Sequence, residues 1–400
     1  MTRSAKSSGS PHRNEEQLLL CCARTRINPQ IRDRIRALVR GPLDWEAAYS
    51  GAKEHGVLPL LCGNLLAVCP EDILERWRKR LKADLLEITQ RNLYLTTEVF
   101  RLSRLFHAKD LFCVPYKGPL LAALAYGDLA LRQFADLDFA ILQRDIFKAQ
   151  AVLLSEGYMA SFGEVAPEEG IRPTHSEYQY RRPEGNVIAE LQTELTLRYF
   201  PTPLDFEAMS NTLTRVTLGG REAFTFSVED TLLLLSVHGA KHFWERLLWI
   251  ADIAELSQIE RGVSWSKAFA RGEELGAGRM LRLALYVAYT MLDAPLPDDV
   301  RKIVLADSAA KKLGEIIRAR FSLQAAAPLG VFDRFRFRAR SRENPWQGMS
   351  YAIRLATSPA NPDREDMPLP GWLSGLRVVL RPFLLMKRYG IRRQKSHQDL

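Results

Sequence analysis

The 400-residue sequence has few cysteines, and their spacing suits neither a zinc site nor a redox pair. The five cysteines form no CxxC pair and have no zinc-ligand rhythm with the seven histidines. No stretch approaches the ~18 uncharged residues that a membrane span needs. The polar start MTRSAKSSGSPHR lacks the apolar core of a signal peptide. These absences predict a cytoplasmic protein with reduced, mostly buried thiols and no transmembrane segment.

A broad excess of charge is also missing from the body of the chain, although the formal net charge is +9. Residues 1–13 carry three bases and no acid, and residues 371–400 carry seven bases and one acid. The two ends therefore account for the whole excess. A neutral body argues against a broad phosphate-binding face and leaves room for a local groove.

Hydrophobic residues make up 46% and charged residues 26% of the chain, which is typical of a soluble globular protein. The periodicity of the apolar residues predicts an α+β fold, in which a small mixed β-sheet core is flanked by N-terminal and C-terminal helical regions. The expected order is a flexible basic N-terminus (1–14), a helical region (15–107), an α/β core (108–227), a helical domain (228–330), and an irregular segment with a basic C-terminal helix (331–400).

Short apolar runs divided by turn residues define the core. We expect strands at 111–116, 136–142, 158–162, 177–182 and 187–196. We expect helices at 119–126, where a proline opens the first turn, and at 145–156, where Gly157 follows the end.

The second expected strand carries two carboxylates in the run ADLDFAIL. Side chains alternate along a strand, so Asp136 and Asp138 share one face while Leu137 and Phe139 share the other. The two acids stand roughly 6.6 Å apart, a spacing that lets both reach one small hard cation or a pair of metal ions. A solvated turn is the alternative explanation of an isolated acid-x-acid pair.

The first expected strand ends in a turn formed by Lys117 and Gly118, and a helix begins at Pro119. Backbone N–H groups at such a junction can face an anion, and a glycine lets phosphate approach closely. Pure turn geometry is the alternative explanation of the glycine.

The order KG, YGD, R and DLD in YKGPLLAALAYGDLALRQFADLDFAI resembles an uncharacterised family of nucleotidyltransferases, which is distantly similar to DNA polymerase beta and the aminoglycoside nucleotidyltransferases. DWEAAYSGAKEHGVLPLLCGNL resembles the family's helical lead-in, LLLLSVHGAKHFWERLLWIADIAEL its histidine-bearing helices, and LPGWLSGLRVVLRPFLLMKR its tail. The resemblance covers most of residues 15–390.

The resemblance implies a divalent-metal site of Mg²⁺ or Mn²⁺ with Asp136 and Asp138 as metal ligands and catalytic residues. In the family's later strand an acid and an apolar residue precede His-Trp, and the matching stretch here is AELQTEL. Glu190 stands at the acidic position as the third catalytic carboxylate and metal ligand, while Gln192 and Thr193 replace His-Trp.

The same resemblance assigns Lys117, Gly118 and Arg132 to the bound nucleotide. The wider superfamily prefers Gly-Ser or Gly-Gly after the first strand, whereas Pro119 follows Gly118 here. Lys117 and Arg132 are therefore expected to neutralise the triphosphate in place of a serine hydroxyl, and both are expected to be partly exposed.

Together these features predict a metal-dependent nucleotidyltransferase that moves a nucleoside monophosphate from an NTP such as ATP to an acceptor and releases pyrophosphate. The acceptor can be a small molecule, a protein or a nucleic acid. The alternative is a catalytically inactive nucleotide-binding or scaffolding protein, in which Gln192 and Pro119 mark lost catalysis.

Three further features allow two interpretations each. His238 and His242 lie four apart on one helical face, which suits a metal or nucleotide contact, and packing in the core is the favoured alternative. Residues 332–338 alternate phenylalanine and arginine, as in a single-stranded nucleic-acid platform or a half-buried element. The basic segment 372–389 can make weak peripheral contact with an anionic membrane, although we favour its packing on the body.

Overall fold

The computed structural model describes residues 12–162, 177–195, 204, 206–259, 262–323 and 329–357. The predicted basic helix at 372–389 lies outside the described residues, as does the start of the chain. No helix among the described residues is both long and apolar enough to cross a membrane.

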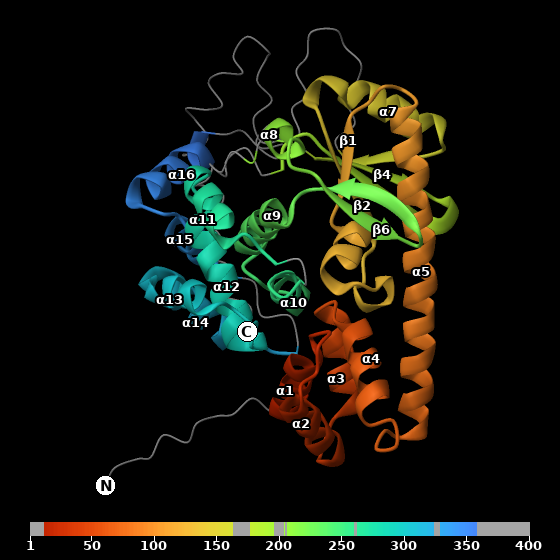
Figure 1. Cartoon of the computed structure of the whole chain (residues 1–400), viewed down its shortest axis with the longest axis vertical. Coiled ribbons are helices and arrows are strands. Elements are labelled where there is room, and N and C mark those ends of the chain that lie inside the picture. The colour runs from red at the N-terminus through yellow and green to blue at the C-terminus, as the bar shows by residue number, and fades with distance from the viewer. Residues whose placement is uncertain are drawn as a thin grey trace, which may run out of the picture.

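Helices make up the N-terminal part of the chain. They are α1 (Arg13–Cys22), α2 (Pro29–Arg40), α3 (Trp45–Glu54), α4 (Leu58–Val68) and α5 (Glu75–His107). Side-chain caps begin two of them, because Asn28 accepts from the N–H of Ile31 and Asp44 from the N–H of Ala47. The long α5 runs beside the sheet along the length of the molecule (Figure 1).

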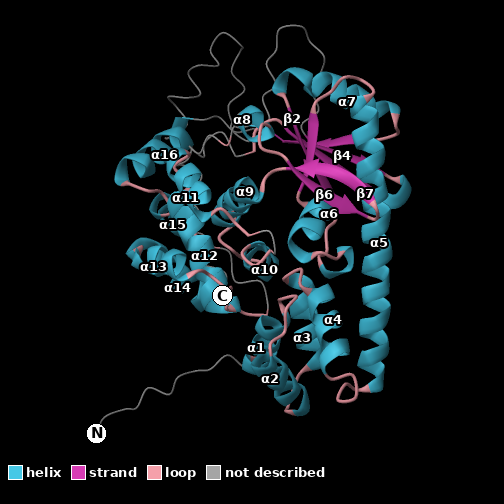
Figure 2. Cartoon of the chain, in the orientation of Figure 1, coloured by secondary structure: helices cyan, strands magenta, loops and turns pink. Residues whose placement is uncertain are grey.

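Five strands form a mixed sheet in the order β1-β2-β5-β4-β3. Figure 2 shows the strands in magenta beside α5. They are β1 (Cys113–Tyr116), β2 (Asp136–Ile141), β3 (Met159–Phe162), β4 (Glu177–Arg182) and β5 (Val187–Gln192). β2 and β5 run parallel, and the other neighbouring pairs are antiparallel. The small mixed sheet and the surrounding helices confirm the predicted α+β fold, with each strand in a predicted place.

The link from β1 to β2 consists mainly of short helical turns. It contains α6 (Gly118–Leu121), a π-helical turn (Ala122–Tyr126) and a short 3₁₀ turn (Leu129–Leu131). After β2, α7 (Ile146–Ser155) packs with α5 and the sheet in one hydrophobic cluster, in which Phe106 of α5 meets Phe139 of β2 edge to face. This cluster fixes β2 from its apolar side.

A two-stranded hairpin, β6 (Thr214–Leu218) and β7 (Arg221–Thr225), was not predicted. Gly219 and Gly220 supply its two positive φ angles of 55° and 79°. The signal was present in TRVTLGGREAFT, where a Gly-Gly pair joins two short runs rich in β-formers.

The C-terminal helices pack as one body with the N-terminal helices. They are α8 (Phe206–Ser210), α9 (Val228–Lys241), α10 (Leu247–Leu256), α11 (Trp265–Glu274), α12 (Gly278–Leu292), α13 (Asp298–Ala306) and α14 (Ser308–Arg320). A single hydrophobic cluster spans both regions. At their contact, His55 accepts from the N–H of Leu247 through Nδ1 and from the N–H of Leu248 through its carbonyl.

The prediction of an irregular segment after residue 330 is wrong for residues 331–357, which form α15 (Val331–Arg340) and α16 (Pro345–Thr357). Phe337 is buried against Phe243, and Phe335 stacks on Tyr351. The segment is therefore a half-buried helix. Two of its three phenylalanines pack inside the protein and are not available to stack on nucleic-acid bases.

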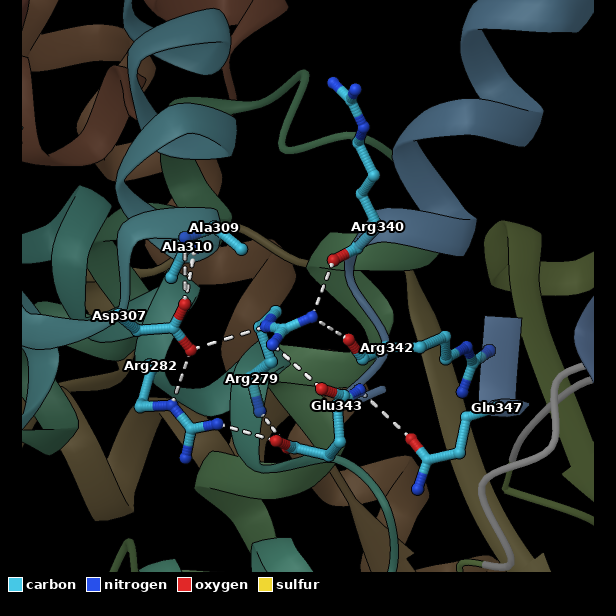
Figure 3. Close-up of polar contacts among 9 residues, drawn as sticks. All are labelled: Arg279, Arg282, Asp307, Ala309, Ala310, Arg340, Arg342, Glu343 and Gln347. Carbon is cyan, nitrogen blue, oxygen red and sulfur yellow. Dashed lines mark hydrogen bonds and ion pairs between the residues drawn. The ribbon is translucent and has the colours of Figure 1, made fainter. Parts of the chain in front are cut away.

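Four charged residues fasten the α15–α16 pair to the helical body (Figure 3). Asp307 accepts from Arg282 Nε at 2.8 Å and from Arg279 Nε at 3.4 Å. Glu343 accepts from Arg282 Nη2 at 2.6 Å, and its carbonyl accepts from Arg279 Nη2 at 2.8 Å. The network joins α12, the start of α14 and the loop between α15 and α16.

Candidate active site

Strand pairing brings the three predicted carboxylates together. Asp136 and Asp138 lie two residues apart on β2, and Glu190 on the parallel neighbour β5 is opposite Asp138. The expectation that Glu190 lies on a strand adjacent to β2 is confirmed. Because paired strands stand ~4.8 Å apart and residues i and i+2 share a face, all three side chains leave the same face of the sheet.

Polar neighbours contact these carboxylates from two sides. Asp138 Oδ1 accepts from Lys117 Nζ and from Gln192 Nε2, each at 3.1 Å. The same amide reaches Glu190 Oε2 at 3.5 Å. The hydroxyl of Tyr116 donates to Gln192 Oε1, which orients the amide so that its NH₂ group faces the acids.

The turn after β1 holds Lys117 in a strained backbone conformation. Lys117 has φ 55° and ψ −149°, and Gly118 has φ 41°. A non-glycine residue in such a region costs about 1–3 kcal/mol, and such residues cluster at functional sites. A Cβ on Gly118 would lie 3.4 Å from the carbonyl oxygen of Asp136, so the turn runs close against β2.

The pKa values of two of the carboxyl groups are raised, mainly by burial. Burial raises the pKa of Asp138 to about 7, Lys117 opposes this, and Asp136 and Glu190 add to it. Burial also raises the pKa of Glu190, although a hydrogen bond from Gln179 at 2.9 Å opposes the rise. Burial is therefore the main reason why both carboxyl groups hold a proton more tightly than a free acid does.

The carboxylates open into a cavity of about 200 Å³ between the sheet and α9. Its acidic wall comes from β2, β4, β5 and the residues that follow β5, and its opposite wall comes from α9. The charged and imidazole side chains that line it are Lys117, Asp136, Asp138, Glu177, Glu190, Glu194, His238, Lys241 and His242.

The donor set suits Mg²⁺ or Mn²⁺, because carboxylate oxygens are the ligands that these hard cations prefer. A divalent cation would also offset the negative charge of the carboxylates that line this cavity. Within the described ranges, no three His, Cys, Asp or Glu side chains already converge closely enough to hold an ion. Lys117 and Gln192 would therefore have to turn aside from Asp138 for an ion to bind there.

A family model described as "Uncharacterised nucleotidyltransferase" matches residues 41–293, which is more than half of the chain. The chain belongs to this nucleotidyltransferase family. The matched span contains the sheet, the three carboxylates and the α9 wall. No curated protein matches the chain.

In this family member the α9 wall carries two histidines. The rings of His238 and His242 lie 4.6 Å apart, and they pack on Trp249 at 5.2 Å and 5.4 Å. Burial is the largest cause that lowers both pKa values, that of His238 well below its ordinary value and that of His242 to about 4. Both imidazoles are therefore neutral at pH 7. The favoured interpretation, core packing, describes only part of their role, because both also line the cavity.

Arg132 does not line the cavity of this nucleotidyltransferase, and the expectation that it is partly exposed is wrong. Its exposed fraction is 6%, and its Nε and Nη2 donate to Asp252 of α10 at 2.7 Å and 2.9 Å. Asp252 also accepts from the hydroxyl of Tyr126 at 2.7 Å. Asn92 of α5 donates to the carbonyl of Arg132 at 2.9 Å, so the segment before β2 is tied to helices on two sides.

A larger cavity of about 450 Å³ lies between the N-terminal helices, the π-helical turn and β6. Its only acid among the described lining residues is Glu255, which accepts from the N–H and hydroxyl of Thr25 and from Gln258. The three predicted carboxylates line the smaller cavity and not this one.

Sequence reasoning gave no role to Glu177, Gln179 or Lys241. Glu177 and Gln179 alternate along β4, and Gln179 is paired with Glu190, so both share the face of the carboxylates. The alternation in EYQYRR was visible in the sequence, but the pairing of β4 with β5 was not. Lys241 needed the fold, because only the packing of α9 against the sheet brings it to the acids.

Proposed function

We propose that this protein transfers a nucleoside monophosphate from an NTP to a hydroxyl or phosphate group of an acceptor, with release of pyrophosphate. The observation that carries the proposal is the β2–β5 register, which places Asp136, Asp138 and Glu190 around one cavity beside Lys117. Membership of the nucleotidyltransferase family supports the class of reaction.

Asp136, Asp138 and Glu190 are the residues that would hold Mg²⁺ or Mn²⁺. When bound, the metal neutralises phosphate oxygens and lowers the pKa of the attacking hydroxyl. Glu190 takes the proton of that hydroxyl, because its carboxylate lines the cavity beside the two aspartates.

The acceptor oxygen then bonds to the α-phosphorus of the NTP. The bond from that phosphorus to the bridging oxygen breaks, and pyrophosphate leaves with the electron pair. Lys117 lies where its ammonium can leave Asp138 and neutralise the departing phosphates. Arg132 contributes indirectly, because its pair with Asp252 holds the segment that leads into β2.

A nucleotide-binding protein without transferase activity is the second candidate. The observation that favours it is the contact of both Lys117 and Gln192 with Asp138, together with the finding that no three possible metal ligands converge among the residues that the structure describes. The two candidates differ in pyrophosphate release and agree in nucleotide binding.

The first experiment measures thermal unfolding with Mg²⁺ or Mn²⁺ and each of the four NTPs. A ligand that binds only the folded protein raises the melting temperature by mass action. The Asp136→Asn, Asp138→Asn double variant should fold and lose the metal-dependent increment, because amides keep the shape and remove the charge. The exposed Asp299→Asn is the matched control.

Pyrophosphate release from the same NTP panel, with candidate acceptors, separates the two functions. Release by the wild type and none by the double variant supports transfer. A metal-dependent increment without release supports the second candidate. A double variant that keeps the whole increment contradicts the assignment of Asp136 and Asp138.

A further inference from the structure

The α9 wall of the cavity presents a lysine to the acids of the opposite wall. Lys241 is half-buried and lines the cavity, yet it forms no ion pair with any residue that the structure describes. Lys117, the other ammonium of the cavity, is paired with Asp138. Burial lowers the pKa of Lys241, and the negative charges of Glu177 and Glu190 oppose this shift without cancelling it. Because these acids do not make up for the lost water and none of them forms an ion pair with Lys241, a phosphate group that reached its ammonium would complete its surroundings.

The neighbours of Lys241 suit a phosphate group. His238 and His242 flank it on α9, line the same cavity and are neutral, so each can offer a ring N–H without adding charge. Lys241 and Lys117 are then the cationic side chains that the described part of the cavity presents to an anion. The acids stand on the opposite wall, where they would hold metal ions on the other side of the same phosphates.

The size of the cavity limits what this wall can contact. Pockets that enclose a drug-sized ligand measure roughly 300–1,000 Å³, whereas this one measures about 200 Å³. A phosphate chain fits that space better than a whole nucleotide does. The sugar and base would lie towards the mouth of the cavity, away from Lys241.

The helix α15, which lies outside the matched residues 41–293, holds this wall in place. Arg338 Nη2 donates to the carbonyl of Lys241 at 2.8 Å, and its guanidinium lies 4.8 Å from the ring centroid of Phe243. Phe337 of the same helix packs on that ring at 5.4 Å. The end of α9 is therefore fixed from behind by α15.

We propose that Lys241, flanked by His238 and His242, is the binding site for the pyrophosphate portion of the NTP, and that Arg338 is its positioning residue. The proposal rests on the proposed function, because it assigns the phosphate wall of the same cavity.

The test measures the affinity of inorganic tripolyphosphate by calorimetry in millimolar Mg²⁺. Lys241→Met should weaken binding tenfold or more, because a charged hydrogen bond to phosphate is lost. The exposed Lys53→Met is the matched control and should bind as the wild type does. The melting temperature of Lys241→Met without ligand should equal or exceed that of the wild type, because the variant removes an unpaired ammonium; a merely structural lysine would lower it.

Arg338→Met should weaken tripolyphosphate binding less than Lys241→Met does. Adding it to Lys241→Met should cause no further loss, because it acts through Lys241. Unchanged affinity in Lys241→Met, or a wild type that binds no tripolyphosphate, overturns the inference even if pyrophosphate release is observed. Loss of binding in Lys241→Met without any pyrophosphate release upholds the anion site and rejects the transferase function.

Discussion

Asp252 is the buried link between the helical body and the segment before β2. It is 0% exposed and accepts from Arg132 through two hydrogen bonds and from Tyr126 through a third. Replacing it by leucine leaves a guanidinium in a space closed to water, without its counter-charge. Removing one partner of a buried ion pair costs about 3–5 kcal/mol. Because the entropy of unfolding grows with chain length, 1 kcal/mol shifts the melting temperature of a 400-residue chain by only about 1 °C, and we expect a fall on the order of 5 °C.

A double-mutant cycle tests this prediction by urea and thermal unfolding. Asp252→Leu, Arg132→Met and the double variant are compared with the wild type. The double variant should be more stable than Asp252→Leu alone, because two apolar side chains leave no charge unpaired. Glu222→Gln, in the exposed pair with Arg215, is the control and should cost less than about 1 kcal/mol.

The reasoning is refuted if Asp252→Leu costs less than about 1 kcal/mol. It is also refuted if the double variant loses the full sum of the two single losses. Either outcome would mean that Arg132 reaches water, and a direct contact with the triphosphate would again be possible.

Three further predictions follow from single residues. As the pH falls from 6.5 to about 4, the wild type should lose stability relative to His242→Gln, by at most roughly 3 kcal/mol. The reason is that the imidazole of the unfolded chain takes up a proton, whereas the folded site excludes it. Urea unfolding measured against pH tests this, with the exposed His107→Gln as control. Asp307→Ala should cost about 2–3 kcal/mol and Asp307→Asn about 1 kcal/mol less, because the amide can still cap α14; equal melting temperatures would exclude the cap. Gly118→Ala should lower the free energy of unfolding by about 1–2 kcal/mol, because φ is 41° there, and it should also weaken NTP binding. Gly157→Ala, at φ 79°, is the control: it should lower stability by the same amount and leave NTP affinity unchanged.

The sequence predicted the elements that carry their own local signal. The alternation in ADLDFAIL placed Asp136 and Asp138 on one face of a strand, and the structure has β2 there. Turn and cap residues gave the positions of β1, α7 and β4 to within a few residues. These features depend on neighbours in the chain, so a single sequence contains the information.

Local signals failed where packing decided. The Phe–Arg alternation of residues 332–338 left a strand and a helix equally open. In the helix that the structure shows, Phe335 packs on Tyr351 and Phe337 on Phe243. Asn344 caps α16 by accepting a hydrogen bond from the N–H of Gln347. This single local signal did not suffice to predict the helix.

For the site, the sequence determined which carboxylates lie on strands and that Lys117 follows the first strand. Only the tertiary structure decided which side chains meet. The parallel register places Glu190 opposite Asp138, and the packing of α9 places Lys241 at the cavity. Arg132 instead pairs with Asp252, 120 residues along the chain, and does not line the cavity. Contacts of this kind join residues that are far apart in the chain. Which residues meet depends on how the sheet and helices pack, and the pattern of either segment alone does not contain that information.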